Sequence, residues 1–187
     1  MVNLQLDDRM VLRDLQPDDA EAILDTVTQN YEHLKPFTHW ITPDYSLRSA
    51  TEFIERSDRD REERRTLELG IFDQNQFVGS IGFVNFDWAA KKTEIGYWIS
   101  KAYEGKGIVC AACKRLIRFA FDELDLKRIE IRSSTENRRS VAIPERLGFI
   151  KEGVLRQATL CDGKLHDLAI YGLLRAEWTS EDGSAEL

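Results

Sequence analysis

The sequence predicts an α/β fold in which a mostly antiparallel sheet of about seven strands is flanked by helices. The apolar patterns along the 187 residues follow the order β-α-α-β-β-β-α-β-α-β-β, without an internal repeat or a low-complexity linker. Residues 95–99, 108–124 and 127–132 read as strand, helix and strand, the pattern of a parallel crossover. We expect one domain at residues 1–178 and a flexible, acidic tail at 179–187.

Local signals place the elements of the N-terminal half. Residues 10–15 read as the first strand, and Pro17, followed directly by acidic residues, opens a helix that continues toward Leu34. The charges of residues 55–65 are balanced and include pairs four positions apart, which indicates the solvated face of a second helix. Two strands then follow around a turn, at residues 66–72 and 77–86.

The C-terminal half carries further signals of this kind. A strand at 93–99 leads into the crossover helix, whose apolar residues recur at helical spacing. Asn137 caps another helix, and Gly148 terminates it. Two strands, at 149–160 and 165–174, close the fold as a hairpin around an Asp-Gly turn.

Composition excludes several classes of protein. A formal net charge of −7 argues against a general nucleic-acid binder, which needs a basic face. The N-terminus lacks the features of a signal peptide, and no apolar run is long enough to span a bilayer, so we expect a cytoplasmic protein without membrane contacts. Cys110-x-x-Cys113 lies within a predicted helix, which favours small apolar residues over redox or zinc chemistry. The three histidines are scattered, and no metal site is predicted.

Gly105 and Gly107 mark the most informative segment, between the strand at 93–99 and the crossover helix. Glycines at such a junction let backbone N–H groups converge at the positive end of the helix dipole, where a phosphate binds well. The P-loop pattern fails because Lys106 is followed by glycine, and the dinucleotide pattern lacks its third glycine. Either another phosphate-bearing ligand binds here or the glycines only turn the chain.

Aromatic residues and histidines are dense between residues 31 and 45, where Pro36 and Pro43 interrupt regular structure. Such a segment can cap the core as a loop, or it can form one wall of an acceptor pocket. The sequence leaves both interpretations open.

Four motifs follow one another along the chain. They are Glu94-Ile-Gly-Tyr-Trp-Ile99, Glu104-Gly-Lys-Gly-Ile108, Asn137-x-x-Ser140 with Leu-Gly-Phe after it, and, as support, His166-Asp167-x-x-x-Tyr171. With these motifs the chain resembles the GNAT superfamily of acyl-CoA-dependent N-acetyltransferases, and within it the RimJ/RimL-type ribosomal-protein N-terminal acetyltransferases, including their YdaF-like members. The resemblance covers essentially the whole chain.

The resemblance implies acetyl-CoA as co-substrate and a sheet that splays beside the strand at 93–99. The pantetheine arm would pair with the backbone near Trp98 and Ile99. Asn137 would contact this arm, besides its capping role. The family's loop pattern starts with Gln or Arg, and here that position is Ala102. The diphosphate would lie on the amides of Glu104, Gly105, Lys106, Gly107, Ile108 and Val109.

The resemblance also implies catalytic roles. Ser140 would protonate the departing sulfur, because the position of the tyrosine used by many relatives is Pro144. Glu94 would act as general base through water, or it is a strand-end carboxylate paired with a basic neighbour. RimL-like enzymes carry a glutamate where this chain has Thr159. Asp167 and Tyr171 would orient the acceptor, or they would only pair with neighbouring residues to support the structure.

The activity implied is transfer of acetyl to a primary amine by direct attack in a ternary complex. The expected acceptor is a protein N-terminal α-amine of the ribosomal-protein type, and the expected assembly is a homodimer. A small amine, such as a polyamine or an aminoglycoside, is an alternative acceptor. A CoA-binding module without catalysis, or an unrelated phosphate-binding domain, is a further alternative.

Overall fold

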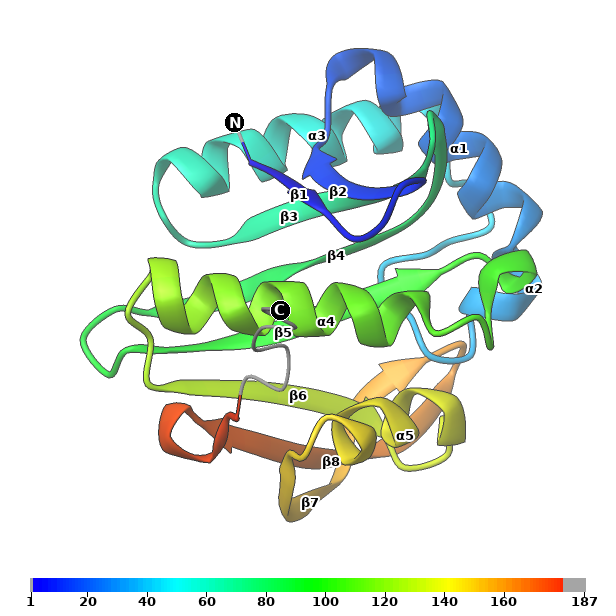
Figure 1. Cartoon of the computed structure of the whole chain (residues 1–187). Coiled ribbons are helices and arrows are strands. Elements are labelled where there is room, and N and C mark those ends of the chain that lie inside the picture. The colour runs from blue at the N-terminus through cyan, green and yellow to red at the C-terminus, as the bar shows by residue number, and fades with distance from the viewer. Residues whose placement is uncertain (1, 180–187) are drawn as a thin grey trace.

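The computed structural model describes residues 2–179, and a single eight-stranded sheet runs through them (Figure 1). The strand order is β1-β2-β3-β4-β5-β6-β8-β7, and each neighbouring pair is antiparallel except β5 and β6. The strands are β1 Asn3–Gln5, β2 Met10–Asp14, β3 Leu67–Asp73, β4 Gln76–Asp87, β5 Lys92–Ile99, β6 Arg128–Ser134, β7 Ile150–Cys161 and β8 Lys164–Leu174.

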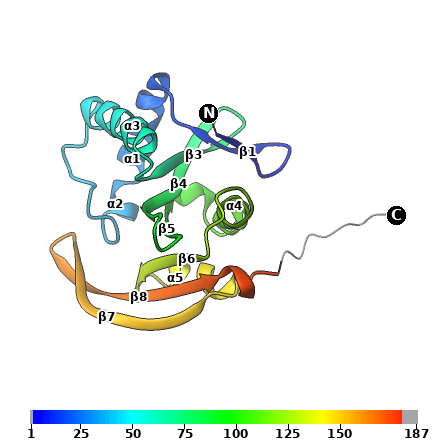
Figure 2. The same cartoon turned by 90° about the vertical axis from the view of Figure 1, so that its left-hand side faces the viewer.

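Helices cover both faces of the sheet (Figure 2). A 3-10 turn at Pro17–Asp19 leads into α1, and α1 and α3 pack over one face, whereas α4 and α5 pack over the other. The helices are α1 Ala20–Gln29, α2 Tyr31–Leu34, α3 Leu47–Glu62, α4 Ile108–Arg118 and α5 Arg138–Arg146, and a π-helical turn at Phe119–Glu123 extends α4. None of the described helices is long and apolar enough to cross a membrane.

Each face of the sheet carries its own buried core. The larger core lies under α4, where Leu116 and Ile117 are fully buried against residues such as Ile81 and Ile95. The smaller core joins Ile23 and other residues of α1 and α3 to the opposite face of β3 and β4. Burial on both faces explains why the central strands are apolar almost throughout.

The predicted α/β fold is confirmed, and three local differences have physical causes. The sheet has eight strands, because Asn3–Gln5 pairs with β2 although it is too short to leave a periodic pattern. The helix predicted from Pro17 toward Leu34 is divided at Asn30, whose backbone leaves the helical region. Ser46 caps α3, which therefore begins well before residue 55. The tail predicted at 179–187 lies, apart from Thr179, outside the described residues.

The two parallel strands stay together only briefly. β5 pairs with β6 at Lys92–Glu94, opposite Arg128–Glu130, and no pair follows although both strands continue. Because β4 still pairs with β5 as far as Ile99, the opening lies on the β6 side of β5. The sheet is therefore splayed at the carboxyl ends of its parallel strands, where ligands of open sheets collect.

Candidate active site at the splayed strands

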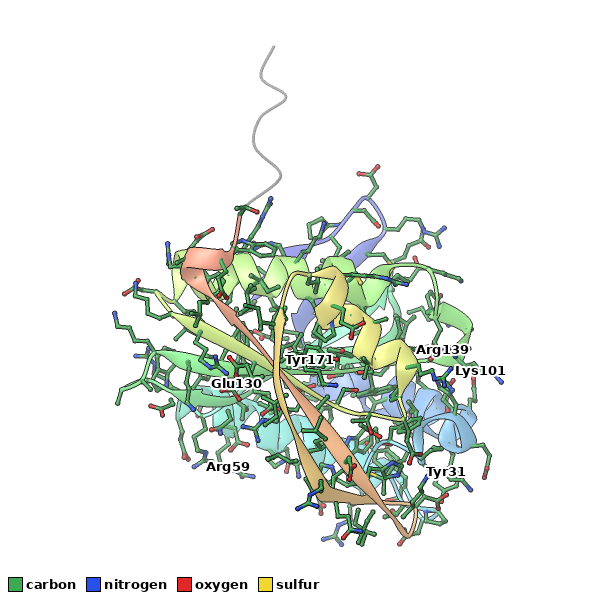
Figure 3. All side chains as sticks on the ribbon, turned by 90° about the horizontal axis from the view of Figure 1, so that it is seen from below. Tyr31, Arg59, Lys101, Glu130, Arg139 and Tyr171 are labelled. Carbon is green, nitrogen blue, oxygen red and sulfur yellow. The ribbon has the colours of Figure 1, made fainter. Side chains whose placement is uncertain are left out.

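A cavity of about 1450 Å³ occupies the region where β5 and β6 separate. Its walls include the glycine loop before α4, the N-terminal turn of α5, and the segment that contains α2. Lys101, beside the glycine loop, donates its backbone N–H to Asn30 Oδ1 at 2.8 Å, which holds the loop against the end of α1. Figure 3 shows Tyr31, Lys101 and Arg139 at the same end of the molecule, away from Glu130 and Tyr171.

The glycine loop has the geometry expected of an anion site. Gly105 and Gly107 have φ angles of +71° and +78°, which side chains rarely adopt, and no heavy atom lies within 4 Å of where a Cβ would stand. Gly107 is also the N-cap of α4 and offers no side chain to its first turn. The N–H groups at this helix start are therefore left for a ligand.

Glu104 fixes the loop to both neighbouring walls. Its Oε1 lies 3.0 Å from His33 Nε2, and its Oε2 accepts from Arg139 Nη1. Lys106 lies with its Nζ 4.6 Å from the ring centroid of Tyr103. Sequence reasoning did not anticipate these contacts, because their partners lie on separate elements.

The end of β5 offers one free backbone edge. Trp98 and Ile99 pair with Ser80 and Gly79 of β4, while no β6 residue pairs with them. Residue 79 must be glycine at this approach, because a Cβ would stand 2.4 Å from the carbonyl oxygen of Trp98. An extended ligand can therefore add to the open edge of β5 as a strand does.

Ser140 lies in the first turn of α5 and contacts β5 across the slot. Asn137 is the N-cap of α5 and accepts the N–H of Ser140 at 3.2 Å, as its capping role predicts. The Ser140 hydroxyl donates to Tyr97 Oη at 3.1 Å, and Tyr97 donates to the Ser140 carbonyl oxygen at the same distance. Burial raises the pKa of Tyr97, so its phenol stays protonated.

Glu94 is paired with a basic neighbour and also faces the cavity. Its Oε2 lies 3.2 Å from Arg132 Nε, while Arg132 also reaches Glu130 at 3.0 Å. Burial raises the pKa of Glu94, the charge of Arg132 opposes this, and Glu130 adds to it. The result is a carboxyl group that takes up a proton more readily than an exposed glutamate.

Aromatic residues of the segment after α1 form the opposite wall. The rings of Trp40 and Trp98 have centroids 5.9 Å apart, and Phe37 meets His166 at 5.7 Å. The interpretation as a pocket wall therefore holds for Phe37 and Trp40, while Tyr31 packs against the smaller core.

The remaining candidates divide between the cavity and the scaffold. Thr159 lines the cavity on β7. Asp167 accepts the backbone N–H of Gln157, and Tyr171 is buried with its hydroxyl bonded to Glu145 at 3.0 Å, so both have structural partners. Cys113 is buried and Cys110 lies at the cavity edge. Within residues 2–179, no three potential metal ligands form a group.

An open strand edge that leads to an uncapped helix start suits a long ligand that ends in a diphosphate. These features define an acyl-CoA-dependent transferase of the GNAT type. A family model described as Acetyltransferase (GNAT) domain matches residues 9–150, and the chain belongs to this family. It is therefore an N-acetyltransferase that takes acetyl-CoA as co-substrate, and its relatives include ribosomal-protein acetyltransferases of the RimJ/RimL type.

Individual relatives agree with this assignment. YdaF of Bacillus subtilis, whose name describes a ribosomal N-acetyltransferase, is 36% identical over 182 residues, which cover 97% of this chain and all of the relative. The solved structure of the microcin C7 self-immunity acetyltransferase MccE with acetyl-CoA and AMP is 30% identical in sequence and has a TM-score of 0.86. The match covers 90% of this chain and 94% of the MccE chain. A RimL structure with coenzyme A shares the fold, with a TM-score of 0.88 at 22% identity. This match covers 92% of this chain and 98% of the RimL chain.

Substitution of Gly107 by glutamate tests the anion site. We expect Gly107→Glu to weaken acetyl-CoA binding at least tenfold, about 1.4 kcal/mol, because it adds a negative charge and a strained φ beside the helix start. Isothermal titration calorimetry measures the affinity. Gly163→Glu is a matched control, because Gly163 has a φ of +72° in a hairpin turn outside the cavity. Equal affinities in the two variants would contradict the assignment.

Proposed function

We propose that this enzyme acetylates the N-terminal α-amine of a protein, by direct attack of the amine on acetyl-CoA in a ternary complex. One observation carries the proposal: a single cavity is continuous from the glycine loop to the wall of Trp40 and Phe37. Coenzyme and acceptor can therefore meet without a covalent enzyme intermediate. The names of relatives support a ribosomal protein as acceptor, since the Escherichia coli ribosomal-protein-serine acetyltransferase is 33% identical over 101 residues, 54% of this chain.

The chemistry of the acceptor also favours an α-amine. An α-ammonium has a pKa near 7.7–8.0, so deprotonation at pH 7 costs about 1 kcal/mol, whereas a lysine near 10.4 costs about 4.6 kcal/mol. A partly neutralised carboxylate such as Glu94 is a weak base. Such a base suits an α-amine better than the side-chain amine of a lysine.

The binding roles follow from the free donors. The amides from Gly105 to Val109 hold the diphosphate, and the open edge of β5 at Trp98 and Ile99 holds the pantetheine arm. The amide of Glu104 was also predicted to bind the diphosphate, but this N–H donates to the Lys101 carbonyl oxygen at 3.3 Å. Asn137 stands at the mouth of the slot, where its amide contacts the arm besides capping α5. A backbone N–H at the end of β5 meets the developing oxyanion.

The catalytic roles follow from the side chains of the slot. Ser140 delivers a proton to the departing sulfur, and the Tyr97 hydroxyl holds the serine toward β5 until it does so. Glu94, acting through water, takes a proton from the acceptor nitrogen.

A small cationic amine is the second candidate acceptor. The net charge of −7 attracts cations, and the cavity carries the carboxylates of Glu52, Glu68 and Glu94.

We also propose that the enzyme is a homodimer in the cytoplasm, where acetyl-CoA and newly made proteins are found. The outermost strand β7 and its hairpin partner expose large apolar side chains, which a second copy would bury. They include Ile150, Leu160 and Leu165, each more than half exposed.

An acceptor screen tests the proposed function. With saturating acetyl-CoA, we expect peptides with a free N-terminus and no lysine to show kcat/KM values at least about tenfold above those of polyamines and aminoglycosides. Thiol release, followed with a colorimetric reagent, measures the rate. Faster turnover of the small amines would make the second candidate the function, and CoA binding without thiol release on any amine would overturn both.

Replacement of Ser140 tests the proton donor. We expect Ser140→Ala to lower kcat at least about 100-fold, because the thiolate then leaves unprotonated, with little change in CoA affinity. Ser57→Ala is the matched control, since its hydroxyl bonds the backbone of its own helix outside the cavity. An unaltered kcat in Ser140→Ala would remove the serine from the mechanism.

The pH dependence of kcat tests Glu94. A base acts only when ionised, so the wild-type kcat should rise with pH as Glu94 ionises, and Glu94→Gln should be slower above this rise and should lack it. Glu130→Gln removes a charge that raises the pKa of Glu94, and the acid limb should therefore move to lower pH while the maximal rate is kept. Stopped-flow rates between about pH 5 and 9 measure both effects. A profile that is identical in all three proteins would exclude Glu94 as the base.

A further inference from the structure

A second carboxylate of the cavity, Glu68 on β3, has no role in the mechanism so far. It is partly buried and lines the cavity. Its Oε1 accepts a hydrogen bond from the Ser80 hydroxyl, and its Oε2 stands 3.0 Å from where a Cβ of residue 82 would be. The carboxylate thus lies over Gly82 of β4, on the side of β3 that faces β5. Among the described residues, no cation lies within ion-pair distance of it.

Two glycines occupy the row between Glu68 and the coenzyme slot, and the second of them, Gly96, is covered by the side chain of Val84. Glu68 is paired with Gly82, and Gly82 is paired with Gly96 of β5, so the three residues form one row across three strands. Neighbouring strands lie about 4.8 Å apart, so the carboxylate over β4 is about one strand spacing from β5. Glycine is required at residue 82, because a Cβ there would stand 2.1 Å from the Leu67 carbonyl oxygen, whereas at residue 96 a Cβ would meet only the side chain of Val84, at 2.8 Å.

The charged groups around this row leave Glu68 ready to exchange a proton. Arg56 faces it from α3, and Ser80 faces it from β4. From β5, Glu94 lies on the same face of the sheet, with its charge balanced by Arg132. Burial raises the pKa of Glu68 to about 7, against the opposing effects of the Ser80 hydrogen bond and the Arg56 charge. The carboxyl group is therefore half ionised near neutral pH.

We propose that Glu68 binds the acceptor's ammonium group in the cavity beside Gly82 and Val84 and accepts the proton that this group must lose before it attacks. This role rests on the proposed acetyltransferase function. The N–H bond breaks, its electron pair stays on nitrogen as the attacking lone pair, and the proton moves to Glu68 Oε2. After the C–N bond forms, the second proton leaves the nitrogen through water to Glu94, and Ser140 protonates the sulfur as the C–S bond breaks. Ser140 then regains a proton from water, and Glu68 and Glu94 release theirs to solvent.

This arrangement selects α-amines over lysines. Transfer of a proton from an α-ammonium with a pKa of 7.7–8.0 to a carboxylate near 7 is unfavourable by only about five- to tenfold. The same transfer from a lysine near 10.4 is unfavourable by about 2500-fold. Glu68 would thus contribute to the specificity of the enzyme as well as to its rate.

The pH profile of kcat/KM for a short, lysine-free peptide with a free N-terminus tests this role. The wild-type profile should rise through about pH 7, as Glu68 ionises, and fall above about pH 8, where the peptide loses the ammonium proton. Glu68→Gln should be slower by about 10²–10⁴-fold at pH 7 and should keep rising to about pH 9, because only the neutral amine reacts. Glu68→Asp should restore part of the rate and the falling limb.

Controls separate this role from folding and from the proposed function. Glu55→Gln changes an exposed glutamate of α3 outside the cavity and should match the wild type. Thermal melting and acetyl-CoA titration of each variant report on folding and on the coenzyme site. A Glu68→Gln profile with the wild-type shape and rate overturns the role of Glu68 while the function stands. A wild type that binds acetyl-CoA yet acetylates no amine overturns the function, and the role of Glu68 with it.

Discussion

The early separation of β5 from β6 is the constraint on which the site depends. Three residue pairs hold these parallel strands together, and the strands then diverge. Parallel neighbours require a crossover, which α4 supplies, so the start of this helix must lie at the same end of the sheet as the opening. One topological requirement therefore places a free strand edge beside the N–H groups of a helix start, with only the glycine loop between them.

The same opening brings the proposed reacting groups together from three elements. α5 presents Ser140 to Tyr97 of β5 across the slot, while Glu94 and Glu68 approach from the other face of the sheet. The proposed donor for the sulfur and the proposed bases for the amine thus stand on opposite sides of β5. Such a division suits a transfer in which one substrate lies along the strand edge and the other lies over the sheet.

Features encoded by neighbouring residues could be predicted from the sequence. Asn137 caps α5, Gly148 ends it with a φ of +78°, and the two loop glycines adopt left-handed conformations, because each depends on local backbone geometry. Contacts between distant segments could not be predicted in this way. The pairing of Ser140 with Tyr97 and the position of Glu68 over Gly82 depend on sheet register, which one sequence does not fix.

The partners of Glu104 have a consequence for the electric field of the molecule. An acidic side chain in an anion-binding loop would repel phosphate, but Arg139 meets this carboxylate and compensates its charge, while His33 contacts its other oxygen. Arg138 and Arg146 of α5 also line the cavity. A protein with an overall charge of −7 thus keeps a locally electropositive entrance for a polyanion. Its isoelectric point describes its behaviour in bulk solution and says little about the sign of the potential that an incoming nucleotide meets.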